Sequence, residues 1–273
     1  TLDGDGIPHG EGLFAGDGPI AVTTGDDLSS GVYVTTGTVD IRSTGGDVTV
    51  DTKLAEILGN VSIKADAGTV NVNQEIANIR SGHNLLITAG TDINLNRQID
   101  ALDDSNPLSI VPVAGGSVTF TAGNNVNLNR DLATFNGPVD IRAAAGTLNI
   151  AWNGDESRNY RINSGTMPVT VTAGGNLSTG TAIPSGLTFP DIDVSGLPII
   201  DQFPAKLAYI ADQLQPWVSL VTTGKLTLTS TAKNVTVDAP IPDTTGEVEI
   251  NAGDAIVVNG KILSNNQNIT LDA

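Results

Sequence analysis

The chain has 273 residues, enough to bury a substantial core. Aromatic residues make up only 4% and charged residues 16%, while the hydrophobic fraction is 39% with 31 glycines, so Val, Ile, Leu and Ala supply the apolar content and favour many short β-strands separated by turns. The 13 basic and 30 acidic residues give a net charge of −17, which repels polyphosphate and argues against nucleic-acid binding.

Residues 1–35 are expected to form an acidic, turn-rich lead-in. Within it, the run from Leu2 to Pro8 reads Leu-Asp-Gly-Asp-Gly-Ile-Pro and resembles the Ca²⁺ loop of thrombospondin type 3 repeats. The resemblance implies that Asp3 and Asp5 bind Ca²⁺, since alternate carboxylates on a glycine-rich turn bring several oxygens to one hard cation. A solvated acidic turn is the alternative. Beyond this candidate Ca²⁺ site, nothing in the sequence calls for a cofactor.

From residue 36 to residue 175 the chain repeats itself at about 22 residues, a period typical of solenoids. Val126 and Ile93 occupy equivalent positions 126 − 93 = 33 residues apart, because residues 103–113 are inserted into one period. The cadence returns over residues 222–273. The repeats start at glycines: Gly37, Gly59, Gly82, Gly116, Gly137, Gly224 and Gly246.

Each repeat contains two short runs that alternate apolar and polar residues. Such a strand pair cannot bury its apolar face alone, whereas stacked coils share one core. The pattern therefore predicts an all-β fold, a right-handed parallel β-helix with coils of about 22 residues. An antiparallel sandwich is the alternative, since strands at roughly 8- to 12-residue spacing also suit it. The residues predicted to point inward are Val61, Ile63, Val70, Val72, Val126, Leu128, Val248 and Ile250.

Polar residues recur at fixed places in the repeat. An Asn or Asp follows the second strand, where side-chain amides are expected to stack in a ladder along the solenoid. Asp40 with Arg42, and Asp140 with Arg142, recur in the same Val-Asp-Ile-Arg context and predict outward salt bridges. The ladder positions are Asp51, Asn73, Asn96, Asn129, Asp238 and Asn259.

Two regions break the cadence. Residues 151–167 are a loop-like excursion, and residues 176–221 are a proline-rich excursion. The second contains an apolar stripe at helical spacing, which predicts a short helix near 203–215 outside the solenoid. A helix of that length is marginal alone, so the stripe either covers a flank of the solenoid or contacts a partner. The stripe and candidate interface consists of Phe203, Leu207, Ile210, Leu214 and Trp217.

The recurring pattern G-x-[VL]-x-[IL]-x-A-x-x-G-x-[VIL]-x-[VIL]-N, and the closing run from Ala252 to Leu263, resemble the β-helical shaft of filamentous-haemagglutinin-type exoproteins. The resemblance covers about residues 36–150 and 222–273. It implies a large adhesin of Gram-negative bacteria, located extracellularly or on the outer cell surface and exported by two-partner secretion. The absence of cysteine is compatible with export, and no apolar stretch is long enough for membrane insertion.

The expected function is therefore a non-catalytic structural or adhesive segment that assembles end to end. Its partners would be other copies of itself or adjacent β-helical domains, with a host receptor or glycan as a further partner. A carbohydrate-active β-helix enzyme is the alternative, but it needs clustered carboxylates on an outward strand face, where this chain has chiefly Thr, Asn and Ser. The remaining candidates for such a site are Asp155, Glu156 and Arg158, near Trp152 and Tyr160.

Overall fold

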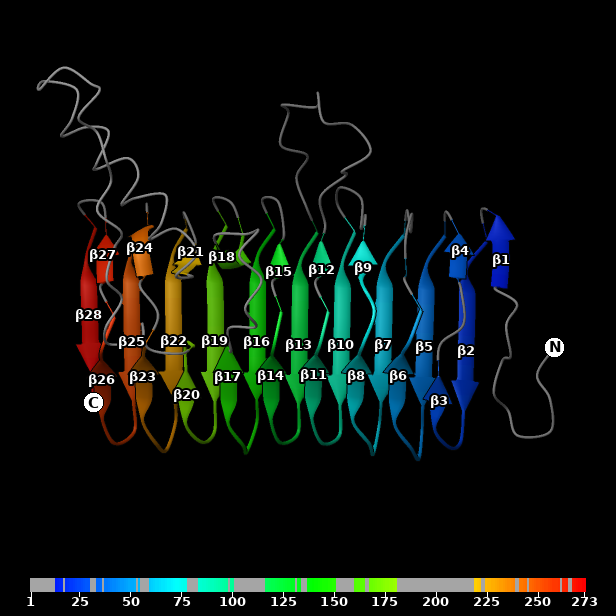
Figure 1. The fold of residues 1–273 in the computed structure, drawn as a ribbon, viewed down its shortest axis with the longest axis horizontal. Helices are drawn as coiled ribbons and strands as arrows, with labels where there is room; N and C mark the ends of the chain where they lie inside the picture. The colour runs from blue at the N-terminus through cyan, green and yellow to red at the C-terminus, as the bar shows by residue number, and fades with distance from the viewer. Residues whose placement is uncertain are drawn as a thin grey trace, which may run out of the picture.

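A computed structural model shows strands stacked along one axis, with β1 (Leu13–Gly16) at one end and β28 (Ile269–Asp272) at the other (Figure 1). Every strand pairing in the part of the chain that it describes is parallel, which rules out the antiparallel sandwich. The described residues are 13–16, 18–29, 33–35, 37–52, 54, 59–77, 83–97, 99–100, 116–130, 132–133, 137–150, 160–164, 167–180, 219–221, 224–238, 241–244, 246–260, 262–264 and 267–273.

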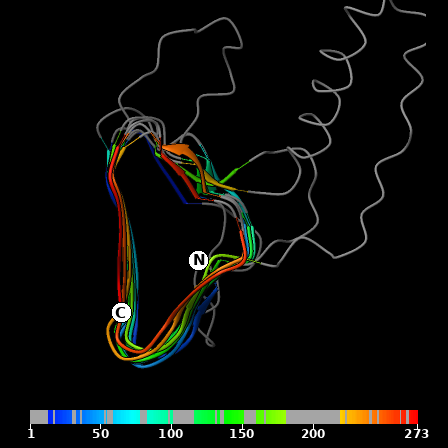
Figure 2. The same cartoon turned by 90° about the vertical axis from the view of Figure 1, so that its left-hand side faces the viewer.

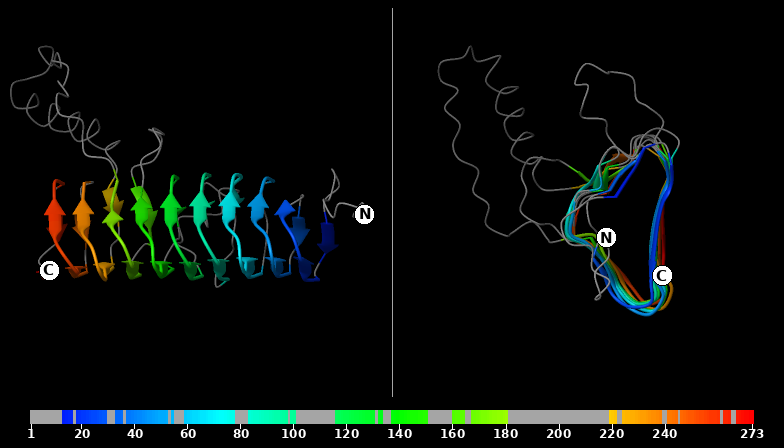
Figure 3. Two further views of the ribbon diagram at one scale, coloured as in Figure 1. Left: turned by 90° about the horizontal axis from the view of Figure 1, so that it is seen from below. Right: turned by 90° about the vertical axis from the view of Figure 1, so that its right-hand side faces the viewer.

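Each coil has three sides (Figure 2). The first sides of the stacked coils together form a ten-stranded sheet. Its pairings keep one register throughout, so residues at equivalent places in successive coils lie side by side. Viewed from either end (Figures 2 and 3), the chain winds in the right-handed sense. The strands of this sheet are β2 (Ile20–Thr24), β5 (Val39–Ser43), β7 (Val61–Ala65), β10 (Leu85–Ala89), β13 (Val118–Ala122), β16 (Val139–Ala143), β19 (Val169–Ala173), β22 (Leu226–Ser230), β25 (Val248–Ala252) and β28.

The second side is a nine-stranded sheet and the third consists of shorter strands. The nine-stranded sheet holds β3 (Leu28–Ser29), β6 (Val48–Val50), β8 (Val70–Val72), β11 (Ile93–Leu95), β14 (Val126–Leu128), β17 (Leu148–Ile150), β20 (Leu177–Ser178), β23 (Val235–Val237) and β26 (Ile256–Val258). The third side holds β9 (Ile76–Ala77), β12 (Ile99–Asp100), β15 (Leu132–Ala133), β18 (Tyr160–Asn163) and β21 (Ser219–Val221), and the pairs β1 with β4 (Tyr33–Thr35) and β24 (Ile241–Thr244) with β27 (Ile262–Ser264).

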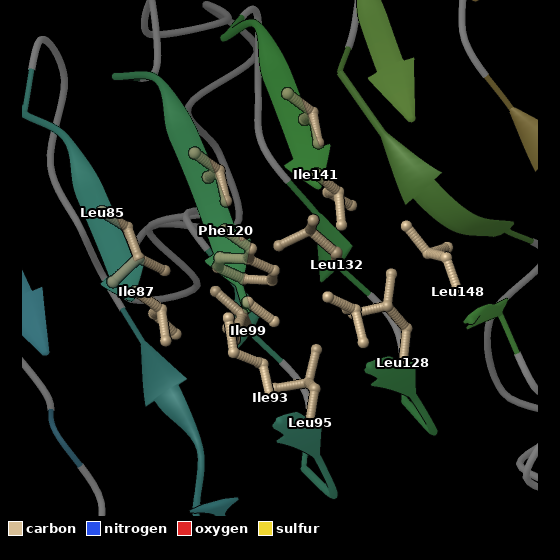
Figure 4. Packing of buried hydrophobic residues seen from close by; sticks show 14 of the residues in the cluster. Leu85, Ile87, Ile93, Leu95, Ile99, Phe120, Leu128, Leu132, Ile141 and Leu148 are labelled. Atoms are coloured by element: carbon tan, nitrogen blue, oxygen red, sulfur yellow. The ribbon is translucent and has the colours of Figure 1, made fainter. Parts of the chain in front are cut away.

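One continuous apolar core fills the inside of the stack (Figure 4). In the strands of the middle coils, inward residues are buried and their neighbours point out, as in β7, where Val61, Ile63 and Ala65 are buried. All eight residues predicted to point inward are at most 1% exposed. Where the first side meets the second, the last residue of eight of the ten strands is Ala or Ser, because the chain turns sharply there: Ser43, Ala65, Ala89, Ala122, Ala143, Ala173, Ser230 and Ala252.

The glycine cadence has a steric cause. Gly37, Gly59 and Gly246 lie at the corner before the first side, where a Cβ on any of them would collide with the backbone of the preceding coil. Gly59, for example, lies against the carbonyl group of Gly37. Glycine permits this close approach in most coils, which is why the period can be read from the sequence, although His83 and Met167 take the equivalent place in two coils.

The structure differs from the predicted organisation in its boundaries. Strands β1 to β4 precede residue 36, so coils begin within the expected lead-in. Strand β18 lies inside the excursion expected at 151–167, and β20 and β21 lie inside the one expected at 176–221. The third short strand of each coil was not foreseen, because it holds as few as two residues and shows no alternation. The helix predicted near 203–215 lies outside the described residues.

Candidate functional site

The outward face of the nine-stranded sheet carries ladders of side-chain amides. In the first, Asn73 Nδ2 donates to Asp51 Oδ1 at 3.0 Å, and Asn96 and Asn129 each donate to the preceding amide oxygen at 2.9 Å. A parallel ladder runs two residues earlier in each coil, from Asn127 through Asn94 to Asn71, with both bonds 2.9 Å long. The ladder predicted from the sequence is confirmed, and the second one is additional.

Each ladder has a direction, since every amide donates toward the preceding coil. An ionised Asp has no proton to donate, so it fits only the first position. Asp51 begins the first ladder, where it also accepts a bond from Ser29 Oγ at 3.0 Å. Asp238 likewise begins a ladder, accepting from Asn259 Nδ2 at 2.7 Å. The choice between Asn and Asp along this face therefore follows from the direction of donation.

A further set of side chains ties each coil to the next at the turn between the first and second sides. Asp47 Oδ1 accepts the backbone N–H of Thr69 at 2.7 Å, and Asp92 Oδ1 accepts that of Asn125 at 2.8 Å. Asn125 Oδ1 in turn accepts the backbone N–H of Thr147 at 2.8 Å. These carboxylate and amide oxygens accept hydrogen bonds from backbone N–H groups of the next coil, so their role is structural.

The ion pairs of the first side also join neighbouring coils. Arg42 bonds to Asp66 in the following turn, with Nε to Oδ2 at 2.9 Å, rather than to the expected Asp40 on its own strand. Lys225 Nζ lies 2.8 Å from Glu249 Oε2. The hydrogen bond from Lys225, then one from Asn251, lowers the pKa of Glu249 below its ordinary value. Both pairs are well exposed, so they contribute little to stability.

Two long insertions leave the stack at one corner, between the second and third sides. Residues 151–159 connect β17 to β18, and residues 181–218 connect β20 to β21 in the next coil. Leu148 pairs with Leu177 before the insertions, and Tyr160 pairs with Ser219 after them. Their attachment points are therefore neighbouring rungs of the same corner. Residues 101–115, by contrast, leave from the corner between the third and first sides.

The rung that carries the longer insertion is irregular. Thr179 occupies a buried place that holds Val237 in the next coil, and within the described part of the chain its hydroxyl has no hydrogen-bond partner. Gly180 has φ 117°, a conformation that side chains disfavour, and it directly precedes the insertion. The backbone therefore leaves the solenoid at a glycine that follows a polar residue in the core.

The last coil exposes apolar side chains that earlier coils bury. Val258, Ile269 and Leu271 are 41%, 44% and 51% exposed, although their partners in the preceding coil are fully buried. At the opposite end, Ile20 and Leu28 are only 5% and 3% exposed. The two ends of the described stack therefore differ: the core is covered at the first and open at the last.

The side chains that the sequence suggests for binding or catalysis lie largely outside the described residues. This holds for the candidate Ca²⁺ ligands Asp3 and Asp5, for the aromatic and charged residues of 151–159, and for the stripe Phe203, Leu207, Ile210, Leu214 and Trp217. Among the described residues, no three His, Asp or Glu side chains are grouped to hold a metal ion. That same part of the chain contains no helix long and apolar enough to cross a membrane.

Comparisons with protein-family models, with curated protein sequences and with solved structures find no match to this chain. The fold is therefore established from the structure itself.

Proposed function

We propose that this chain is a non-catalytic structural and adhesive β-solenoid segment of a large bacterial protein, placed outside the cell or on its surface. The observation that carries the proposal is the unbroken register of the ten-stranded sheet. Nine rung spacings of about 4.8 Å make a shaft roughly 43 Å long. The Asn and Asp side chains along its second side form hydrogen bonds between coils, as in a spacer that holds contact elements apart.

The contact elements in this proposal are the two insertions at one corner. The chain has only two tryptophans, Trp152 and Trp217, and the sequence places one in each insertion. Large aromatic residues are enriched where proteins bind partners, and this chain otherwise contains few of them. Because neighbouring rungs anchor both insertions, a receptor or glycan could engage them together.

The test replaces the longer insertion by the connection that an ordinary coil uses. Between β8 and β9 that connection has 76 − 72 − 1 = 3 residues, Asn73 to Glu75. We expect a variant with residues 180–218 replaced by a copy of these residues to keep the β-rich circular dichroism and to lose binding to cultured epithelial cells. The matched control replaces residues 101–117 by a copy of residues 78–84, the loop between β9 and β10, and should keep binding.

Two results would contradict the adhesive proposal. One is unchanged cell binding after loss of residues 180–218. The other is release of reducing ends from polygalacturonate by the purified chain, which would establish the carbohydrate-active alternative.

End-to-end assembly is the second part of the proposal. The open core at the last coil, around Ile269 and Leu271, and the free edge of β28 suit a further parallel coil. At the other end of the stack, Ile20 and Leu28 are covered, so the first coil of another copy is less suited to pack on the open last coil. An adjacent β-helical domain is therefore the favoured source of the further coil. If another copy nevertheless supplies the coil, light scattering should show self-association of the purified chain, and Leu271→Lys should reduce it. A fully dispersed chain at high concentration would contradict self-association.

Calcium binding at Asp3 and Asp5 completes the proposal. It is supported by the alternate carboxylates of the loop-like run from Leu2 to Pro8. Titration calorimetry should give a Ca²⁺ heat that disappears when both residues are changed to Ala. The absence of any such heat in the unchanged chain would remove calcium from the account.

A further inference from the structure

We propose that Asn259 is a site of spontaneous deamidation whose product loosens the last rung of the nine-stranded sheet. Among the asparagines that the structure describes, Asn259 is the one followed by glycine, Gly260. A following glycine has no Cβ to obstruct attack by its own backbone nitrogen and reaches the required backbone conformations easily. The proposal is independent of the adhesive function, because it concerns the covalent stability of the stack.

The chemistry needs only water. The Gly260 nitrogen gives up its proton and attacks Asn259 Cγ, so a new C–N bond forms. The Cγ–Nδ2 bond then breaks, and ammonia leaves with that proton, which produces a cyclic imide. Water opens the imide at either carbonyl and yields aspartate or isoaspartate.

The stack controls when this reaction can occur. Asn259 is exposed, and it follows β26, the edge strand of the nine-stranded sheet. The attacking Gly260 N–H donates to the Val237 carbonyl oxygen at 2.9 Å, as does the N–H of Asn259 itself. These bonds must open before Gly260 can attack, so the reaction follows local opening of this rung. The ladder residues Asn73 and Asn96 lie within the stack and precede bulky residues.

The product cannot restore the contact that the amide made. Asn259 Nδ2 donates to Asp238 Oδ1 at 2.7 Å, and this bond ties β26 to β23. Deamidation removes the donor and leaves two carboxylates facing each other, which repel. The reaction therefore turns a transient opening of the rung into a lasting one.

The first experiment measures conversion by peptide mapping and mass spectrometry of the full chain after incubation at mildly alkaline pH. We expect conversion at Asn259 and none at Asn73 and Asn96 over the same time. Gly260→Ala should slow conversion at Asn259 at least several-fold. Asn136 and Asn153, which also precede glycine in the sequence, serve as positive controls for the incubation. Conversion at these two without conversion at Asn259 would overturn the proposal.

The second experiment tests the structural consequence with the product made directly. Asn259→Asp should reduce hydrogen-exchange protection of residues 256–258 and leave that of residues 93–95 unchanged. Adding Asp238→Asn should restore protection, because an amide at residue 238 can donate to the new carboxylate. Unchanged protection in Asn259→Asp, or a double variant no better than the single one, would show that the facing carboxylates do not open the rung.

Discussion

The inward and outward alternation of β8 allows a sharp test on adjacent residues. Val70 is fully buried between Val48 and Ile93, whereas the next residue, Asn71, lies on the outward face. We therefore compare Val70→Asp with Asn71→Asp. The two variants introduce the same side chain one residue apart in one strand, so any difference between them reports which way the strand faces.

The expected cost of Val70→Asp follows from its burial. Losing the burial of a valine costs about 1.5 to 3 kcal/mol. The carboxyl group then lies in an apolar core without a partner, which adds about 1 to 3 kcal/mol even if it takes up a proton. The sum is about 2.5 to 6 kcal/mol. Asn71→Asp keeps an acceptor for Asn94 Nδ2, now 2.9 Å from Asn71 Oδ1, and should cost less than about 1 kcal/mol.

Urea unfolding followed by far-ultraviolet circular dichroism measures both costs. We expect a large fall in the urea midpoint for Val70→Asp and a small change for Asn71→Asp. Equal midpoints, or the reverse order, would refute the register of this strand and with it the assignment of the core.

Three further predictions test the glycine corner, the amide ladder and the exposed ion pair. Gly59→Ala should destabilise the chain by about 1 to 3 kcal/mol, because its Cβ would collide with the preceding coil, while Gly25→Ala, with nothing within 4 Å of the new Cβ, should not. Asn96→Asp should cost about 1 kcal/mol in urea unfolding, since it removes one ladder donor and sets two oxygens against each other. Lys225→Ala should raise the pKa of Glu249 toward its ordinary value in an NMR titration. Because folding lowers that pKa, the contribution of the ion pair is present above the unfolded pKa and is lost as pH falls through the folded one; a pKa unchanged by Lys225→Ala would contradict this.

The coil itself could be predicted because its signals are local and strong. Alternation around Val61 and Ile63 sets the facing of the strands, and the glycine corner sets the period. The ladder could be predicted for the same reason, since Asn73 and Asn96 recur at one place in the repeat. Each of these features depends on contacts that every coil makes in the same way.

Other features could not be predicted from the sequence because they depend on which coils become neighbours. The first coil begins before residue 36, and the sequence does not reveal it because it is shorter than the others. It has 39 − 20 = 19 residues from Ile20 to Val39 rather than about 22. Thr170 and Thr227 lie on either side of residues 181–218, so the sequence alone does not show that they share a register. The structure pairs them directly. The third strand had one usable signal, an Ile or Leu three residues after each ladder position, as at Ile76 and Ile99.

The most direct test of the central claim, a parallel β-helix that continues across the long insertion, uses the absence of cysteine from the chain. Thr170 and Thr227 pair in register on adjacent rungs, so their Cα atoms should lie about 5 Å apart, within reach of a disulfide. Thr229 lies two residues further along the same strand, roughly 8 Å from Thr170 and out of reach. Under mild oxidation, the pair Thr170→Cys with Thr227→Cys should form an intramolecular disulfide, and Thr170→Cys with Thr229→Cys should not. Equal cross-linking of both pairs, or none in the first, would contradict the stacked fold.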